Sequence, residues 1–223
     1  MEIINNNSNT EIDPNPNLGI FDRFMNFLEA KGFAIQLEKQ VKGRLNVGFV
    51  DSAFEQMMKS VGWQSSQAWC GYYVKLVLMQ LFSFDKEFLS KNIGGGAMQN
   101  LVNVQNLNKK GDKRYIAFTD GKLQVGDVFC GTRVKGGHTG IIVQILDKET
   151  NYCETIEGNT NSTKSGEGDK VKKLKRYLIV GKSSAGLTIK GFFRRNFTEQ
   201  ELNSISYDEN KQTYVFENKN EII

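Results

Sequence analysis

The spacing of apolar residues changes once along this chain, and the change limits the folds open to it. Up to about residue 107, apolar side chains recur every three or four residues, as on the buried face of a helix. After residue 120, short apolar runs alternate with glycine-rich turns, which is typical of strands joined by hairpins. Helices followed by an antiparallel sheet indicate the α+β class.

Four segments have helical periodicity. Residues 18–31 repeat apolar positions at helical spacing, and residues 51–60 begin with a capping residue, Asp51 or Ser52. A glycine break at 94–96 precedes the last and most polar of the four. The expected helices are 18–31, 51–60, 67–82 and 97–107.

Five segments after residue 120 have the character of strands. A turn at 147–151 joins two of them into a hairpin, and His138 opens the first strand of that hairpin. The stretch 198–223 is polar, so we expect it to be peripheral. The expected strands are 127–130, 138–145, 152–157, 172–180 and 187–193.

The composition is that of a globular protein without a membrane segment. The 223 residues are enough to bury a core, and 39% of them are hydrophobic and 24% charged. No run approaches the 18 apolar residues of a transmembrane helix, so we expect no membrane insertion. The first residues lack the basic and apolar regions of a secretory signal peptide. We therefore expect synthesis in the cytoplasm and, for any export, another route.

The formal net charge is +4, and its densest source is the basic stretch 170–177. This stretch is either a solvated strand face or a surface that contacts an anionic polymer such as a cell wall. No nucleic-acid-binding motif accompanies it, so we expect no nucleic-acid partner. The three cysteines (Cys70, Cys130 and Cys153) are widely spaced and form no CxxC pair, which argues against a disulfide framework.

His138 is the only histidine in the chain, and hence the only side chain whose unperturbed charge changes near neutral pH. Its expected partner is Cys70, in the first turn of the third expected helix, where the helix dipole favours a thiolate. The next strand ends in Glu157 and, two residues on, Asn159, which offer a carboxylate and an amide to orient the imidazole. This order of cysteine, histidine and Glu or Asn is that of a papain-like thiol hydrolase.

Four motifs extend this pattern over residues 45–195. Residues 61–74 read VG…WCGYYV, and residues 126–143 read GDV…GGHTGIIV. Residues 155–161 read TIEGNTN, and residues 189–194 read IKGFFR. In the same order, these resemble the SVG…WCAAFV, GD(I/V)…GGHVGIVV, TIEGNT and (K/R)GFIR motifs of CHAP domains, the cysteine, histidine-dependent amidohydrolase/peptidase family.

The resemblance implies a papain-like, NlpC/P60-type fold, with the catalytic cysteine at a helix N-terminus packed on the antiparallel sheet. It also implies hydrolysis of peptidoglycan amide bonds, by an endopeptidase or an N-acetylmuramoyl-L-alanine amidase. Cys70 would be the nucleophile and His138 the general base, with Glu157 and Asn159 as orienting and polar partners. The implied organisation is a flexible leader (1–17), an N-terminal helical extension (18–44), a catalytic domain (45–196) and a polar C-terminal extension (197–223).

Four further residues are candidates for contact with substrate. Trp69 would be partly core and partly a wall of the substrate site. Gln67 would donate to the oxyanion, unless it caps the helix or faces solvent. Tyr73 lies one helical turn after the nucleophile, and Gly137 lies in the turn that places His138.

The chain departs from the family pattern beside the nucleophile. Gly71-Tyr72-Tyr73 stands where the family has Ala-Ala-Phe, which would add two hydroxyl groups near the thiol. Some relatives bind calcium through an acidic loop before the cysteine, but residues 61–69 contain no acidic residue. We therefore expect no metal site and no cofactor.

A different chemistry or role is also compatible with these residues. One alternative is a zinc site made of the three cysteines and His138, but these residues lack the closely spaced ligand pairs of most zinc sites. Cys130 and Cys153 are instead typical of small hydrophobic core residues. A papain-like enzyme acting on another amide inside a cell, or a catalytically silent wall-binding or virion module, would also fit the sequence. With peptidoglycan as its expected partner, the chain is expected to be a monomer that acts on the cell wall. It fits a phage lysis enzyme released through a holin, a virion enzyme, or a secreted antibacterial effector.

Overall fold

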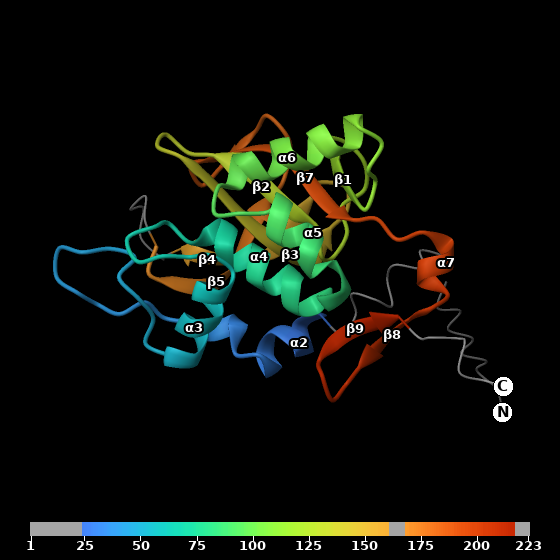
Figure 1. Ribbon diagram of the computed structural model, residues 1–223. Helices are drawn as coiled ribbons and strands as arrows, with labels where there is room; N and C mark the ends of the chain where they lie inside the picture. The colour runs from blue at the N-terminus through green and yellow to red at the C-terminus, as the bar shows by residue number, and fades with distance from the viewer. Residues whose placement is uncertain (1–23, 161–167, 217–223) are drawn as a thin grey trace, which may run out of the picture.

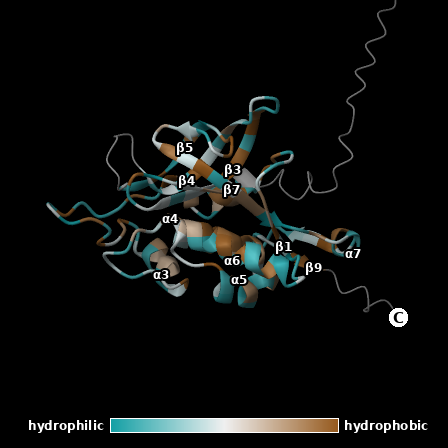
Figure 2. Ribbon diagram, turned by 90° about the horizontal axis from the view of Figure 1, so that it is seen from above, coloured by the Kyte–Doolittle hydropathy of each residue, from teal (hydrophilic) through white to brown (hydrophobic). Residues whose placement is uncertain are grey.

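The helices of the first half of the chain cover one face of the sheet formed by the second half (Figures 1 and 2). The computed structural model describes residues 24–160 and 168–216. Viewed from above, sheet and helices form two layers (Figure 2). This arrangement confirms the α+β class. The leader expected over residues 1–17 lies outside the described residues.

Most of the expected helices form. α3 (Ser52–Ser60) is capped by the Asp51 carboxylate, which accepts hydrogen bonds from the N–H groups of Ala53 and Phe54 at 2.8 and 3.0 Å. α6 (Ala97–Lys109) follows the glycine break. No helix in the described part of the chain is long and apolar enough to cross a membrane. α2 (Phe24–Ala30) lies within the first expected helix. The remaining helices have only one or two turns, which is too few residues to show a periodic pattern in the sequence. They are η1 (Phe33–Ile35), η2 (Ser83–Asp85), α5 (Lys86–Asn92) and α7 (Glu199–Leu202).

The helix that carries Cys70 begins three residues later than expected. α4 (Cys70–Leu81) begins after Trp69, whose φ of −121° and ψ of 7° are not helical, and Ser66 in the turn before it has a left-handed φ of 74°. The indole N–H of Trp63 donates to the carbonyl of Gln67 at 2.9 Å and holds this turn in place. The expected helix start at Gln67 is therefore wrong, and Cys70 is the residue with which the helix begins.

All five expected strands form and pair in one sheet, together with two short strands of that sheet that the sequence did not predict. In the described part of the chain, seven antiparallel strands make one sheet. Their bounds are β1 (Tyr115–Phe118), β2 (Val128–Thr132), β3 (Gly137–Asp147), β4 (Tyr152–Thr160), β5 (Lys170–Tyr177), β6 (Ser183–Ser184) and β7 (Leu187–Arg195). The order across the sheet is β1-β7-β2-β3-β4-β5, with β6 paired to β7. β3 and β4, which carry His138 and Glu157, are thus neighbours.

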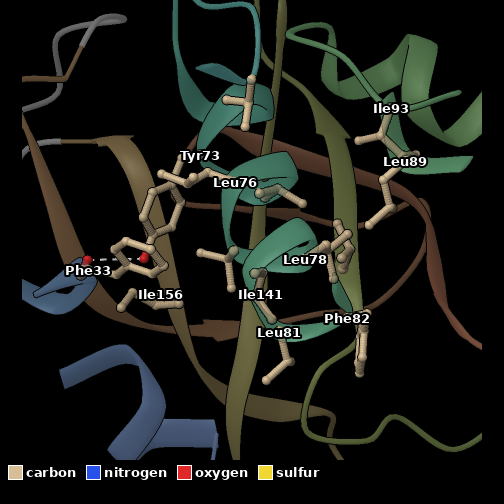
Figure 3. Packing of buried hydrophobic residues seen from close by; sticks show 14 of the residues in the cluster. Phe33, Tyr73, Leu76, Leu78, Leu81, Phe82, Leu89, Ile93, Ile141 and Ile156 are labelled. Carbon is tan, nitrogen blue, oxygen red and sulfur yellow. Dashed lines mark hydrogen bonds between the residues drawn. The ribbon is translucent and has the colours of Figure 1, made fainter. Parts of the chain in front are cut away.

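α4 is the central helix of the core (Figure 3). Nine of its twelve residues are buried. Leu76 and Leu81 belong to the same apolar cluster as Ile141 of β3 and Ile156 of β4. Burial of one such side chain contributes about 1.5–3 kcal/mol, so the cluster fixes the helix that begins with Cys70 on the strands that carry its expected partners.

After η1 the chain is extended and runs along the edge of β5. The carbonyl of Gln36 accepts from the N–H of Val171 at 2.9 Å, and the N–H of Glu38 donates to the carbonyl of Asp169 at 2.7 Å. The stretch 18–44, expected to be a helical extension, is therefore helical only in α2 and η1 among its described residues. Its extended part covers a strand edge that would otherwise present unpaired backbone groups.

The polar C-terminal stretch is less peripheral than its composition indicates. Its described part forms a hairpin of β8 (Ile205–Asp208) and β9 (Thr213–Phe216). The Thr213 hydroxyl lies 2.7 and 3.0 Å from the carbonyl oxygens of Gln80 and Leu81 at the end of α4. Tyr214 is buried and stacks on Phe82, with ring centroids 6.1 Å apart. These two residues tie the hairpin to the core, which polarity alone did not reveal.

Candidate active site

Cys70 is the first residue of α4 and is 4% exposed. The residue before it is firmly anchored. The indole N–H of Trp69 donates to the buried carboxylate of Glu38 at 2.9 Å, and its ring packs edge-on against Phe49 with centroids 4.9 Å apart. Since the N–H groups of a first helical turn have no partner within the helix, the backbone at Cys70 is the kind that can bind negative charge.

Trp69 and Tyr73 are core residues and do not line a substrate site. Both are fully buried. The Tyr73 hydroxyl donates to the carbonyl of Phe33 at 3.1 Å (Figure 3), as the Trp69 indole donates to Glu38. A Cβ added at Gly158 would come within 2.7 Å of both rings, which shows how closely β4 covers them. The expected substrate contacts of these two residues are therefore wrong, and the Tyr73 hydroxyl points into the core rather than toward the thiol.

His138 connects the thiol to a carboxylate. It is the second residue of β3 and is 2% exposed. Its Nε2 lies 2.8 Å from Oε2 of Glu157. An imidazole has two ring nitrogens, so this contact leaves Nδ1 for Cys70, whose interaction with the ring helps raise the pKa of His138. With Nε2–H donated to the carboxylate, a neutral ring presents Nδ1 to the thiol as an acceptor.

The surroundings of His138 favour its protonated form. Burial by itself lowers the pKa of the imidazole. The hydrogen bonds with Cys70 and Glu157, and the charge of Glu157, outweigh burial and raise the pKa above its usual value. An imidazole that gains a proton readily beside a cysteine is the pairing that nucleophilic catalysis by cysteine requires.

Glu157 is fully buried and is held by three side chains. Besides His138, it accepts hydrogen bonds from the Thr155 hydroxyl at 2.7 Å and from Arg176. Burial raises the pKa of this carboxyl, but the hydrogen bonds from His138 and Arg176 and their charges prevail and lower the pKa to about 2. Glu157 is therefore a carboxylate at every pH at which a thiol hydrolase would work.

Arg176 is a member of the site that the sequence did not reveal. Its Nε and Nη2 lie 2.5 and 2.9 Å from the two carboxylate oxygens of Glu157, and it is 5% exposed. It belongs to the basic stretch 170–177, interpreted as a solvated or polymer-contacting face. The pairing of β4 with β5 explains why Arg176 reaches Glu157. Cys153 lies opposite Arg176, and Lys172 lies opposite Glu157. Because side chains alternate between the two faces of a strand, this register puts Arg176 and Glu157 on the same face of the sheet. Arginine is also the residue suited to a two-pronged bond with a carboxylate.

Asn159 lies near the site but bonds elsewhere. It has a φ of 54° and is buried, and its side-chain oxygen accepts from the N–H of Gly168 at 3.3 Å. Nε2 of His138 forms its hydrogen bond with Glu157. Of the two expected orienting residues, Glu157 contacts the imidazole, while the side chain of Asn159 joins the end of β4 to Gly168, just before β5.

Gln67 and Gly137, the remaining candidates for substrate contact, are both exposed. The side-chain oxygen of Gln67 accepts from the N–H of Gln64 at 3.2 Å. Gly137 faces the start of α6, where an added Cβ would lie 3.3 Å from that of Ala97. Both residues can meet a ligand at the surface, unlike Trp69.

The glycine after Cys70 has a steric cause. A Cβ at Gly71 would lie 2.3 Å from the carbonyl oxygen of Gly95, a distance that real Cβ atoms do not adopt. A Cβ at Gly95 would in turn lie 2.3 Å from the ring of Tyr72. The Gly71-Tyr72 departure from the Ala-Ala of the family motif thus matches a loop that packs directly on the first turn of α4.

The other two cysteines are buried and free. Burial raises the pKa of each thiol to about 12, so neither ionises near neutral pH. Cys130 is in weak contact with the hydroxyl of Thr139, at 3.8 Å. Among the described residues, no three His, Cys, Asp or Glu side chains converge as metal ligands, so a zinc site on all three cysteines has no geometric support.

The site therefore brings together a thiol at a helix start, an imidazole, a carboxylate that stays ionised and a buried guanidinium. Such a set can move a proton from sulfur to nitrogen and hold the resulting imidazolium against a fixed negative charge. No protein-family model matches the sequence, and no curated protein matches it.

Proposed function

We propose that this protein hydrolyses amide bonds of peptidoglycan by a thiol mechanism, on a papain-like fold. One observation carries the proposal: His138 is hydrogen-bonded to Glu157, and its ring interacts with Cys70, the first residue of α4, which is among the groups that raise its pKa. The resemblance of the surrounding motifs to CHAP domains supplies the substrate class. The positive net charge agrees with an anionic wall polymer.

The proposed reaction has two stages. Nδ1 of His138 takes the proton of Cys70, and the thiolate attacks the amide carbonyl carbon to form a tetrahedral oxyanion. The N–H of Cys70, unpaired within the helix, donates to that oxyanion. The imidazolium then protonates the leaving amine, the C–N bond breaks and a thioester remains on the sulfur. His138 next takes a proton from water, the hydroxide attacks the thioester, and the thiol and a carboxylic acid are released.

Glu157 and Arg176 act in this proposal through His138. The Glu157 carboxylate fixes the tautomer with Nδ1 toward the sulfur and stabilises the imidazolium of both stages. Arg176 keeps that carboxylate ionised and oriented through two hydrogen bonds. Neither residue contacts the substrate, so both are positioning residues.

The decisive experiment compares wild type with Cys70→Ala, Cys70→Ser and His138→Ala on purified peptidoglycan. We expect wild type to clear the suspension and release fragments, and the three variants to release none. Cys153→Ala is the matched control, because it removes a buried thiol outside the site. Fragment masses identify the scissile bond and so separate an amidase from an endopeptidase.

The same experiment can overturn the proposal. If wild type releases nothing from walls of several chemotypes, the substrate class is wrong. If His138→Ala retains appreciable activity, the thiol mechanism is wrong, because no second histidine can replace it. If wild type instead binds walls without cutting them, the chain is a silent wall-binding module. If the protein is a wall hydrolase, its route to the wall remains to be tested. The routes are release after holin opening, delivery in a virion and secretion. Adding the protein to intact cells from outside shows whether it reaches the wall without such a route.

A further inference from the structure

A pocket of about 410 Å³ lies on the side of α4 that faces α5 and α6. Its volume is in the range of small-ligand sites. The wall combines the loop at Gly95 with polar side chains from three helices, which are Tyr72, Lys75, Ser90, Asn92 and Gln99. None of these residues takes part in the Cys70–His138–Glu157 arrangement.

The unusual member of this wall is Lys75. It is 7% exposed on a helix whose neighbouring residues are mostly apolar and buried. Its ammonium group lies 3.4 Å from the carbonyl oxygen of Ser90. Within the described chain, no carboxylate comes within ion-pair distance of Lys75. Burial lowers its pKa, and no acidic neighbour opposes that effect.

The ammonium group of Lys75 is partly desolvated at the pocket wall and has no counter-ion there among the described residues, and proteins commonly pair such a charge. One backbone carbonyl at 3.4 Å compensates little of this desolvation. An apolar side chain of the same length would fit the same place on α4 at lower cost. The lysine therefore indicates a negative charge that arrives from outside.

We propose that the pocket binds a carboxylate, from a small acid or from the free end of a peptide, with Lys75 as its counter-ion. A single cation suits a single negative charge. The other lysine of the wall, Lys91, is exposed and already pairs with Glu87 at 2.6 Å, so a doubly charged phosphate would find no second cation there. The neutral hydroxyl and amide groups around Lys75 can bond the remaining polar atoms of the ligand. This inference does not depend on the proposed hydrolase activity.

The test compares two ligands that differ only in charge. N-acetylglycine and N-acetylglycinamide have nearly the same size, but only the acid carries a carboxylate. We expect the acid to raise the thermal midpoint of the wild-type protein with increasing concentration and to give a saturable calorimetric titration. The amide should do neither. N-acetyl-D-alanyl-D-alanine then separates the two sources, because tighter binding than N-acetylglycine indicates a peptide end, and equal binding a small acid.

Two lysine variants assign the effect to a residue. Lys75→Met should weaken binding of the acid by more than about tenfold, the value of one charge-assisted hydrogen bond, and should melt higher than wild type without ligand. Lys91→Met, the matched control at the rim, should bind the acid as wild type does.

Three results would overturn the proposal. The first is that N-acetylglycine and N-acetylglycinamide change the thermal midpoint of the wild-type protein equally, or not at all. This result needs only the wild-type protein, so it holds even if Lys75→Met does not fold. The second is undiminished binding of the acid by Lys75→Met. The third is a folded Lys75→Met protein that melts lower than wild type, because the lysine would then stabilise the protein without any ligand.

Discussion

Replacement of Arg176 by methionine tests the charge arrangement behind His138. The substitution keeps an unbranched side chain but removes the guanidinium that bonds both oxygens of Glu157. Loss of one partner from a buried ion pair costs about 3–5 kcal/mol, because the other charge stays buried without its counter-ion. We therefore expect the free energy of unfolding at pH 7 to fall by about 3 kcal/mol.

The pKa of Glu157 gives a similar magnitude for its partners together, His138 as well as Arg176. In the folded protein it is lowered from 4.5 to about 2. Each factor of ten in an ionisation constant corresponds to about 1.4 kcal/mol, so ionised Glu157 contributes roughly 3 kcal/mol. Because the folded pKa is the lower one, this contribution is complete above pH 4.5 and is lost as the pH falls through 2. Without Arg176, burial raises the pKa of Glu157, and the loss begins at higher pH.

The assay is urea unfolding, followed by circular dichroism between about pH 3 and pH 8. We expect the difference between wild type and Arg176→Met to be largest near pH 7 and to shrink as the solution becomes acidic. Arg176→Lys is the matched control, since it keeps the charge but not the two parallel hydrogen bonds, and should fall between the two. A difference that is the same at every pH would refute the reasoning, because Arg176 would then act through packing alone. So would a loss below about 0.5 kcal/mol at pH 7.

Three further predictions concern the same region. The pKa of His138 is raised in the folded protein, so the stability that its protonated ring contributes is complete below pH 6.5 and is lost as the pH rises through the pKa of the folded state. NMR titration of the ring measures that pKa, and we expect Glu157→Gln to lower it. Gly71→Ala should destabilise the protein by about 1–3 kcal/mol in urea despite the better helix propensity of alanine, because its Cβ meets the Gly95 carbonyl, and a more stable variant would contradict the packing described. Glu38→Ala should lower the free energy of unfolding by about 1–3 kcal/mol, because the Trp69 indole N–H loses its acceptor. Glu38→Gln keeps an acceptor and should lower it less. Equal losses for the two variants in urea unfolding would show that this hydrogen bond contributes nothing to stability.

The sequence predicted those parts of the site that depend on local pattern. The alternation in β3 and β4 placed His138 and Glu157 on neighbouring strands, as found. Residue type placed the cap of α3 at Asp51 or Ser52, and the structure shows Asp51. The start of α4 could not be predicted in this way, because the non-helical backbone of Trp69 directly before it has no signal in the residue type.

The errors share one physical cause, which is that burial depends on the tertiary fold. Trp69 and Tyr73 have polar atoms that favour a surface, yet both find partners inside. Arg176 stands among exposed lysines and differs from them only through a carboxylate nineteen residues away. The roles of Glu157 and Asn159 were equivalent in the sequence, and only the direction of each side chain separates them.

The Thr213 hydroxyl at the end of α4 has a consequence for synthesis. A helix leaves its last carbonyls unpaired, and here a side chain 133 positions after Gln80 meets them. A growing chain that has not reached residue 213 cannot make this contact, although Cys70, His138 and Glu157 have all been made. The helix that begins with Cys70 is thus secured at its other end only after residue 213 has been made.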